Sequence, residues 1–234
     1  MNIIQVSDYQ KLSEMAAVII AGQILRKPSS VLGLATGSTP LGIYERLVKL
    51  YQEKCLNFSQ VTSFNLDEYC GLDPQNHQSY HYYMQNHLFF HINMDETKFH
   101  IPNGLAEDIE AECKAYDEKI KQAGGIDLQI LGIGHNGHIG FNEPAHSFLY
   151  GTHQEILDES TIKASSRFFE DISQVPTTAI SMGIGTIMEA KSILLVASEG
   201  KQEIIQKTVY GPIDPQVPAS LLQLHKDVTV VYVG

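Results

Sequence analysis

Positively charged residues are scarce in this sequence of 234 residues. It has 16 lysines and arginines against 27 aspartates and glutamates, which gives a formal net charge of −11. An acidic excess of this size repels the phosphate backbone of nucleic acids and the anionic surface of a membrane, so we expect neither as a partner. Only three of the cations are arginines, Arg26, Arg46 and Arg167. Few side chains can therefore grip an anion in a bidentate way.

Cysteines and long apolar runs are also few. The three cysteines, Cys55, Cys70 and Cys113, fit neither a disulfide framework nor the spacing of zinc ligands. The apolar run at residues 15–25 is interrupted by Gln23, and acidic residues precede it. It resembles neither a signal peptide nor a membrane-spanning helix, and we expect a cytoplasmic protein.

The sequence has no internal repeat, no low-complexity tract and no linker rich in proline or serine. A chain of this length can bury roughly 70–75% of the surface that it exposes when unfolded, which is enough for a full core. We therefore expect residues 1–234 to form a single domain.

Short aliphatic runs alternate with helical patterns along the chain. The runs are near-continuously apolar, as strands covered on both faces should be, and they occupy residues 30–35, 61–66, 127–133, 192–197 and 228–233. The clearest helical pattern covers residues 108–123, with Gly124 at its end. This alternation predicts an α/β fold, a doubly wound and mostly parallel sheet with helices on both faces. In such sheets ligands bind outside the carboxyl ends of the strands.

Residues 35–40, Ala-Thr-Gly-Ser-Thr-Pro, follow the first of these runs and precede a helical pattern that starts at Leu41. Pro40 suits the first helical position, and the loop offers backbone amides and three hydroxyls at the positive end of a helix dipole. These groups suit a phosphate or a sulfate. The alternative is an ordinary turn in which Ser38 or Thr39 caps the helix.

Two acids, Asp67 and Glu68, follow the second run directly. Acids at a strand end often form a solvated turn. Partial burial in a cleft would instead make such a carboxylate a better proton acceptor. Both acids are therefore candidates for a general base.

Residues 132–144 are rich in glycine and carry His135, His138 and Glu143. Glycine lets the backbone approach a ligand closely, and histidine side chains exchange protons near neutral pH. The alternative is a glycine-rich surface loop with exposed histidines. Further on, Arg167 and Lys201 are cations that could close on an anion, although a single surface cation is usually only solvated.

Two histidine pairs, His77 with His81 and His87 with His91, have the i,i+4 spacing that can hold a metal on one helix face. Neither pair has the HExxH pattern or a cysteine nearby. We expect packing or surface histidines there, and no metal site.

Five segments, taken in order, closely resemble the glucosamine-6-phosphate deaminases. They are residues 35–40, residues 64–69 (Phe-Asn-Leu-Asp-Glu-Tyr), residues 137–144 (Gly-His-Ile-Gly-Phe-Asn-Glu-Pro), residues 166–169 (Ser-Arg-Phe-Phe) and residues 199–201 (Glu-Gly-Lys). The resemblance runs from about residue 3 to residue 233. The 6-phosphogluconolactonases resemble the loop through Gly-His but continue with Thr-Ala-Ser, where this chain has Ile-Gly-Phe-Asn-Glu. The difference favours the deaminases.

The resemblance implies that the chain converts D-glucosamine 6-phosphate to fructose 6-phosphate and ammonium. By resemblance, His138 opens the sugar ring with the help of Glu143 and Asn136, and Asp67 transfers a proton between the second and first carbons. The phosphate would be bound by the phosphate-binding set, namely Thr36, Gly37, Ser38, Thr39, Arg167 and Lys201. The resemblance implies no metal and no cofactor, and the H-x-E…P-C-x-x-C pattern of zinc deaminases is absent from the sequence.

The sequence departs from longer family members at two points. Asn136 stands where they have an acid, and an amide cannot stabilise an imidazolium by charge. The longer members also carry a C-terminal extension that supports allosteric activation and hexamers. We therefore expect a monomer or a small homo-oligomer without strong allosteric activation. The competing interpretation, a non-catalytic sugar-phosphate sensor, lacks the basic helix-turn-helix segment expected of a transcription regulator.

Overall fold

The computed structural model describes residues 1–166 and 169–234. Its central sheet is parallel throughout and has the strand order β1-β10-β9-β6-β2-β3-β5. The strands are β1 (Asn2–Val6), β2 (Val31–Leu34), β3 (Thr62–Asn65), β5 (Phe99–His100), β6 (Leu128–Leu131), β9 (Ser192–Ala197) and β10 (Val228–Val233). Each of the five apolar runs contains one of these strands, so the predicted fold class is confirmed.

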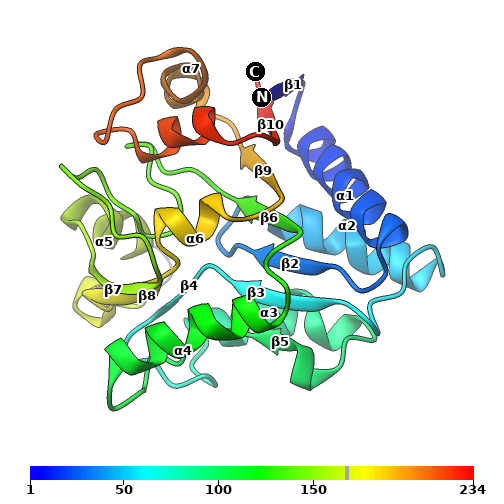
Figure 1. The fold of residues 1–234 in the computed structure, drawn as a ribbon, viewed down its shortest axis with the longest axis horizontal. Helices are drawn as coiled ribbons and strands as arrows, with labels where there is room; N and C mark the ends of the chain where they lie inside the picture. Colours follow the sequence, from blue (N-terminus) through cyan, green and yellow to red (C-terminus); the bar gives the residue numbers. More distant parts are fainter. Residues whose placement is uncertain (167–168) are drawn as a thin grey trace.

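Helices cover both faces of this sheet. They are α1 (Tyr9–Arg26), α2 (Leu41–Gln52), α3 (Tyr80–His87), α4 (Ile109–Gln122), α5 (Glu159–Ser165), α6 (Ile184–Met188) and α7 (Gln202–Tyr210), and short 3-10 turns occupy Phe89–His91, Glu96–Lys98, Ile172–Gln174 and Pro218–Leu224. The helices α1 and α2 lie on one side of the sheet, and α4 and α6 lie on the other (Figure 1). The helix predicted over residues 108–123 is α4, which has Asp108 as its N-cap and is followed, as predicted, by Gly124, at φ +88. Among residues 1–166 and 169–234, no helix combines the length and apolarity needed to span a bilayer.

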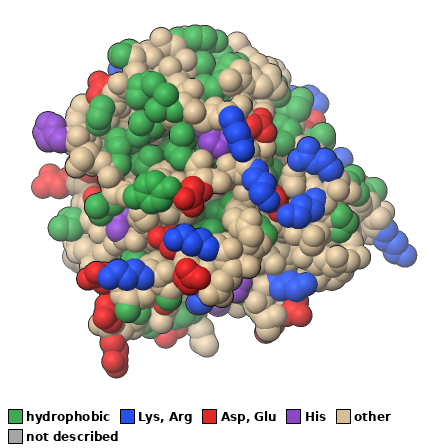
Figure 2. All heavy atoms as spheres, in the orientation of Figure 1, with side chains coloured by type: hydrophobic (Ala, Val, Ile, Leu, Met, Phe, Trp, Pro, Cys, Tyr) green, Lys and Arg blue, Asp and Glu red, His purple; other side chains and the backbone are tan. Residues whose placement is uncertain are grey.

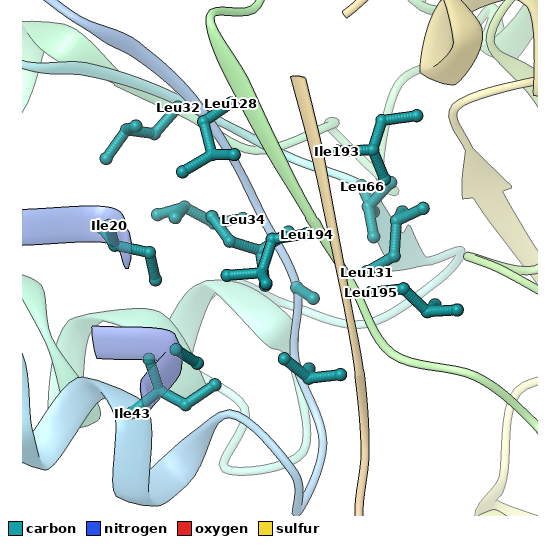
Figure 3. Packing of buried hydrophobic residues seen from close by; sticks show 14 of the residues in the cluster. Ile20, Leu32, Leu34, Ile43, Leu66, Leu128, Leu131, Ile193, Leu194 and Leu195 are labelled. Atoms are coloured by element: carbon teal, nitrogen blue, oxygen red, sulfur yellow. The ribbon is translucent and has the colours of Figure 1, made fainter. Parts of the chain in front are cut away.

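The core explains why the strands are apolar at successive positions. In Figure 3, Leu194 of β9 points toward Ile20 of α1 and Ile43 of α2, whereas Ile193 and Leu195 point to the opposite side of the sheet. All five side chains are at most 2% exposed. Because both faces are covered by helices, side chains on both faces of these strands are buried, and most of them are apolar.

The order of the strands places a topological switch point between β2 and β6. From β2 the chain adds β3 and β5 on one side, and β6, β9 and β10 then extend the sheet on the other side of β2. The carboxyl ends of β2 and β6 therefore flank the point where the direction of winding reverses. This is where ligands bind in doubly wound sheets.

A second, antiparallel sheet has no counterpart among the sequence predictions. Its strands are β4 (Asp67–Tyr69), β8 (Thr178–Ser181) and β7 (His153–Ile156), in that order. Only Leu66 separates β3 from β4. Its backbone hydrogen bonds with Leu34 and Met182 connect the two sheets. Asp67 therefore opens a strand of the second sheet, whereas the sequence analysis placed it only at the end of the first.

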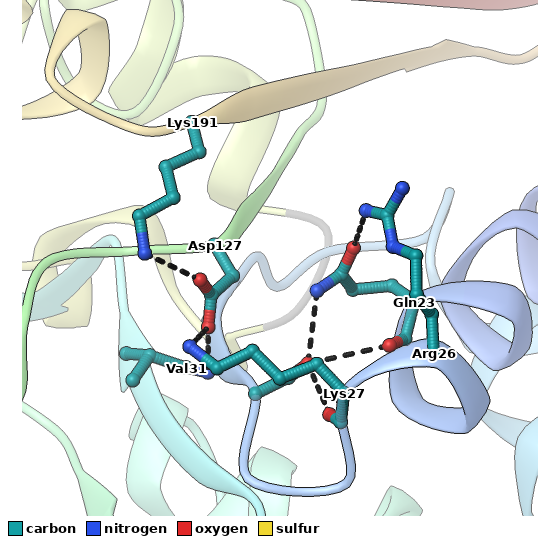
Figure 4. A network of polar contacts seen from close by, with 7 residues as sticks. Gln23, Arg26, Lys27, Val31, Asp127 and Lys191 are labelled. Atoms are coloured by element: carbon teal, nitrogen blue, oxygen red, sulfur yellow. Dashed lines mark hydrogen bonds and ion pairs between the residues drawn. The ribbon is translucent and has the colours of Figure 1, made fainter.

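The opposite, amino-terminal edge of the central sheet is closed by a polar network. The carboxylate of Asp127 accepts hydrogen bonds from Lys27, Lys191 and the backbone N–H of Val31, at 2.6, 2.7 and 2.8 Å (Figure 4). The bonds to Lys27 and Val31 join the start of β6 to the connection between α1 and β2.

Charge is unevenly distributed over the surface. In the face shown in Figure 2, Lys and Arg side chains gather over α1 and the adjoining sheet, whereas Asp and Glu side chains are more frequent over α4. The net charge of −11 is therefore no guide to the local potential at a site.

Candidate active site

The loops that follow β2, β6 and β9 form three sides of the candidate site, and β4 forms the fourth. The loop after β2 carries residues 35–40, and the loop after β6 carries residues 132–144. The loop after β9 leads to Lys201. The hydroxyl of Thr39 donates to that of Ser198 at 3.5 Å, which joins the first of these loops to the third.

The loop of residues 132–144 holds a histidine–carboxylate pair. His138 Nδ1 lies 3.2 Å from Glu143 Oε2, and Asn136 Nδ2 donates to the same oxygen at 2.7 Å. The other carboxylate oxygen of Glu143 accepts a hydrogen bond from the hydroxyl of Thr161 in α5. Burial opposes ionisation of Glu143, but these hydrogen bonds and the charge of His138 outweigh it, so its pKa lies below the ordinary value. Glu143 is thus held as a carboxylate.

Two glycines allow this loop to fold tightly. A Cβ on Gly134 would stand 2.4–2.6 Å from atoms of the His138 ring, so the imidazole packs directly on the backbone. Gly140 has φ +59, and a Cβ there would stand 2.8 Å from the Ser181 hydroxyl and 3.8 Å from an oxygen of Asp67. The loop and the carboxylate of Asp67 are therefore close neighbours.

Asp67 is a buried acid without a counter-charge. Its side chain is 6% exposed, and within residues 1–166 and 169–234 no hydrogen-bond donor or cation is paired with it. Burial, with a smaller contribution from the negative charge of Glu68, raises the pKa of Asp67 to about 8. Once ionised, this carboxylate is a stronger base than an exposed one.

Glu68, the second acid predicted at this position, has a different environment. Its carboxylate accepts three backbone N–H groups, from Tyr69, Tyr80 and His81. Two of these amides belong to the first turn of α3, so Glu68 ties that helix to β4. Burial still raises its pKa, against these hydrogen bonds. Of the two neighbouring acids, only Asp67 receives no donor from the part of the chain that the structure describes.

Aromatic rings line the space beside Asp67. Tyr69, Tyr80 and Phe141 have centroids 4.8–6.1 Å apart, and Tyr80 and Phe141 are parallel. Burial, above all, raises the pKa of Tyr80 well above 10, although a side-chain hydrogen bond with Thr36 acts in the opposite direction. Tyr80 thus connects the loop after β2 to β4 and to the loop after β6.

In the loop of residues 35–40, tyrosine side chains bind backbone carbonyls and leave backbone N–H groups available to a ligand. Tyrosine hydroxyls donate to the carbonyls of Ala35, Gly37, Ser38 and Thr39, and they come from Tyr44, Tyr83 and Tyr9. No acceptor is found in the described part of the chain for the N–H groups of Gly37, Ser38 and Thr39. An anion could accept these hydrogen bonds. Pro40 lies one position ahead of α2, as its cap, and neither Ser38 nor Thr39 caps the helix.

Of the two cations predicted for this site, the structure describes Lys201. Lys201 precedes α7 directly, and the Thr39–Ser198 contact brings its loop next to residues 35–40. Arg167 lies outside the described residues.

The histidine pairs have other contacts. His77 stacks on Tyr82, and His87 contacts Tyr83. His91 bonds to the backbone of Asn86. In residues 1–166 and 169–234, no three histidine, cysteine or acidic side chains are grouped as metal ligands.

The sequence matches a family described as glucosamine-6-phosphate isomerases/6-phosphogluconolactonase over residues 8–231. The chain belongs to this family.

Close relatives within the family share almost the whole chain. A glucosamine-6-phosphate deaminase of Lachnoclostridium phytofermentans is 57% identical over 99% of this chain and 98% of its own length. One from Clostridium novyi is 56% identical over 99% of this chain and 96% of its own length. A solved structure of a monomeric glucosamine-6-phosphate deaminase has a TM-score of 0.97 and 46% identity, covering 100% of this chain and 97% of that one. The predicted family is confirmed.

A 6-phosphogluconolactonase of Thermotoga maritima shares the fold. Its TM-score is 0.77 at 19% identity, with 100% of this chain and 99% of that one covered.

Two polar residues of this family member's site were missed by sequence reasoning. Thr161 binds Glu143 from α5, and Ser181 of β8 accepts the N–H of Phe141 at 3.0 Å. Both contacts join segments that are far apart in the chain. No local motif marks either residue, so a single sequence offered no signal for them.

Proposed function

We propose that this chain is a glucosamine-6-phosphate deaminase, which isomerises and hydrolytically deaminates D-glucosamine 6-phosphate to fructose 6-phosphate and ammonium. The observation that carries the proposal is the approach of Asp67, a buried carboxylate with no donor among the described residues, to the loop that holds the His138–Glu143 pair. The names of relatives at 56–57% identity support it.

The first step of the proposed reaction opens the sugar ring. In the ring form the first carbon is a hemiacetal, so the hydrogen on the second carbon is not acidic. We assign to His138 the transfer of a proton from the anomeric hydroxyl to the ring oxygen. Glu143 would orient the imidazole and stabilise its charged form, and Asn136 would hold Glu143. Such proton transfer contributes about 10²–10⁴-fold to a rate.

Asp67 would then move a proton between two carbons. It takes the proton from the second carbon of the open-chain aldehyde, and the electron pair forms the carbon–carbon double bond of an enolamine while the aldehyde oxygen gains a proton. Return of the proton to the first carbon gives a ketimine. Water adds to the ketimine, ammonia leaves and the ketone remains. One carboxylate between two adjacent carbons is sufficient for both transfers.

The phosphate-binding set is assigned to the substrate phosphate. An anion needs several hydrogen-bond donors. The backbone amides of Gly37, Ser38 and Thr39 and the hydroxyl of Thr36 would supply them. In the same proposal Lys201 and Arg167 supply positive charge. At physiological ionic strength the Debye length is about 8 Å, so distant surface acids are largely screened from this site.

The remaining expectations are part of the same proposal. Residues 1–234 act as one domain, because β4 of the smaller sheet supplies a residue to the site of the larger one. The reaction is a hydrolysis without a metal. The protein works as a monomer, as the named structural relative does, in the cytoplasm.

The test is to incubate the purified protein with glucosamine 6-phosphate and a chelator, and to measure ammonium and fructose 6-phosphate. We expect both products in equal amounts. Accelerated hydrolysis of 6-phosphogluconolactone without ammonium release would show a lactonase instead. Binding of glucosamine 6-phosphate without turnover would show a sensor.

A further inference from the structure

The short helix α5 contacts both Glu143 and β4, the strand that begins with Asp67. The buried hydroxyl of Thr161 donates to Glu143, and Ser165 accepts a hydrogen bond of 3.2 Å from Tyr69. Thr161 and Ser165 are four residues apart, so they lie on the same face of the helix. Tyr69 is two residues beyond Asp67 on β4, and the two side chains therefore point to the same side of that strand.

We propose that Thr161 is a positioning residue for the reaction, which fixes the carboxylate of Glu143 so that its other oxygen faces His138 and Asn136. The kinetic consequences of this inference rest on the proposed function. The hydrogen bonds from which it is drawn do not depend on that function.

The contacts of the two carboxylate oxygens explain why the hydroxyl matters. Oε2 of Glu143 is shared by His138 and Asn136, at 3.2 and 2.7 Å. The hydroxyl of Thr161 is the donor on Oε1, and it comes from a different segment of the chain. With the loop holding one oxygen and α5 the other, the carboxylate cannot rotate away from the imidazole. Without Thr161, a nearly buried oxygen would lose its donor, which favours rotation or protonation of the group.

The charged surroundings of Glu143 make the direction of a pH effect clear. Among the described residues, the groups that face its carboxylate are His138 and Asn136 from its own loop and Thr161 from α5, and of these only His138 is titratable. The charged residues on α5, Glu159 and Lys163, are exposed to solvent, and so is Asp158 just before it. Removing the hydroxyl therefore takes away a contact that favours the ionised form, and ionisation of Glu143 requires a higher pH.

The experiment compares Thr161→Val, which keeps the shape and removes the hydroxyl, with Thr161→Ser, which keeps the hydroxyl. For Thr161→Val we expect kcat to fall about tenfold with KM changed less than about twofold, and the acid limb of kcat/KM to move up by about one pH unit. Thr161→Ser should behave like the wild type. The control is Lys163→Gln, on an exposed position of the same helix, which should change neither quantity.

A second readout needs no turnover. The carboxyl carbon of Glu143, assigned with Glu143→Gln, is titrated by ¹³C NMR in substrate-free protein. Its midpoint should rise by about one pH unit in Thr161→Val and stay in place in Thr161→Ser. If valine disturbs α5, as a lowered thermal midpoint would reveal, Thr161→Ala replaces it and must show the same shift.

The outcomes separate the two proposals. An unmoved Glu143 titration in the variants that lack the hydroxyl, or a serine variant as impaired as the valine variant, would overturn the positioning role while leaving the deaminase proposal intact. A wild type that releases no ammonium, together with a moved titration, would remove the proposed function and retain the positioning role.

Discussion

Two buried aspartates at opposite edges of the central sheet show how strongly surroundings decide what a carboxylate does. Asp127, at the amino-terminal edge, is 5% exposed, and Asp67, beyond the carboxyl-terminal edge, is 6% exposed. Asp127 receives two lysines and a backbone N–H, which outweigh the effect of burial and lower its pKa. Asp67 receives no donor from the described residues, and its pKa rises to about 8.

The difference separates stability from chemistry. A buried carboxylate with partners contributes to folding, because its ionised form is better solvated by the protein than by water. A buried carboxylate without partners costs stability when ionised and gains basicity in return. The first kind, Asp127, lies where strands of the central sheet begin, and the second kind, Asp67, lies beyond the end of β3.

The largest effect is expected from Asp67→Asn. An amide cannot accept the proton from the second carbon, so ammonium release from glucosamine 6-phosphate should fall about 10³-fold. Asp127→Asn is the matched control, being the same substitution at equal burial, and its rate per folded molecule should be unchanged. An undiminished rate in Asp67→Asn would remove Asp67 from the mechanism.

Glu143→Gln should be the next most severe. Glutamine carries no charge to stabilise the imidazolium of His138, so kcat should fall about 10²-fold, measured by the same ammonium assay. Because Asp67 is intact in this variant, exchange of the hydrogen on the second carbon from the open-chain form should persist. Loss of that exchange as well would assign Glu143 to both steps.

For Asp127→Asn we expect a lower free energy of unfolding, by about 2 kcal/mol at pH 7, since both lysine contacts lose their charge partner. That corresponds to a fall of about 4–8 °C in the thermal midpoint. Asp127 has a lowered pKa in the folded state. Its contribution is therefore present above about pH 4 and is lost as the pH falls through that lowered value. A difference between variant and wild type that persisted undiminished at pH 2 would contradict this.

Asp67→Asn should show the opposite trend in stability. Because the folded state raises the pKa of Asp67 to about 8 from about 3.9, ionisation costs stability increasingly as the pH rises between these values. The variant should therefore be more stable than the wild type by at least about 1 kcal/mol at pH 9, and similar to it at pH 4. Denaturant unfolding at both values measures this, and a variant less stable at pH 9 would refute it.

The smallest effect is expected from Asn136→Asp. It restores the acid of longer family members beside Glu143, where Asn136 now donates at 2.7 Å. Activity should survive, with the pH profile of kcat shifted by about one unit or less. An unchanged profile would show that residue 136 acts through hydrogen bonding alone.

The sequence was sufficient for the features that depend on local pattern. Continuous apolar runs such as residues 192–197 predicted buried parallel strands, because strands covered on both faces cannot alternate. The glycine-rich loop around His138 and the loop at residues 35–40 were also recognisable from the sequence. Their residue types suit the backbone conformation of their own segment. The antiparallel sheet was not recognisable, because β4 has only three residues and pairs with β8, a strand much later in the chain.

The sequence alone thus determined the α/β architecture, the family and the side chains capable of acid–base chemistry, all of which follow from residue type and order. Only the tertiary structure showed that Asp67, unlike Glu68 and Asp127, receives no donor from the described residues, and only it attached Thr161 to Glu143. The reason is physical. The pKa of a carboxylate depends on burial and on which donors reach it, and those donors come from segments that become neighbours only when the chain folds.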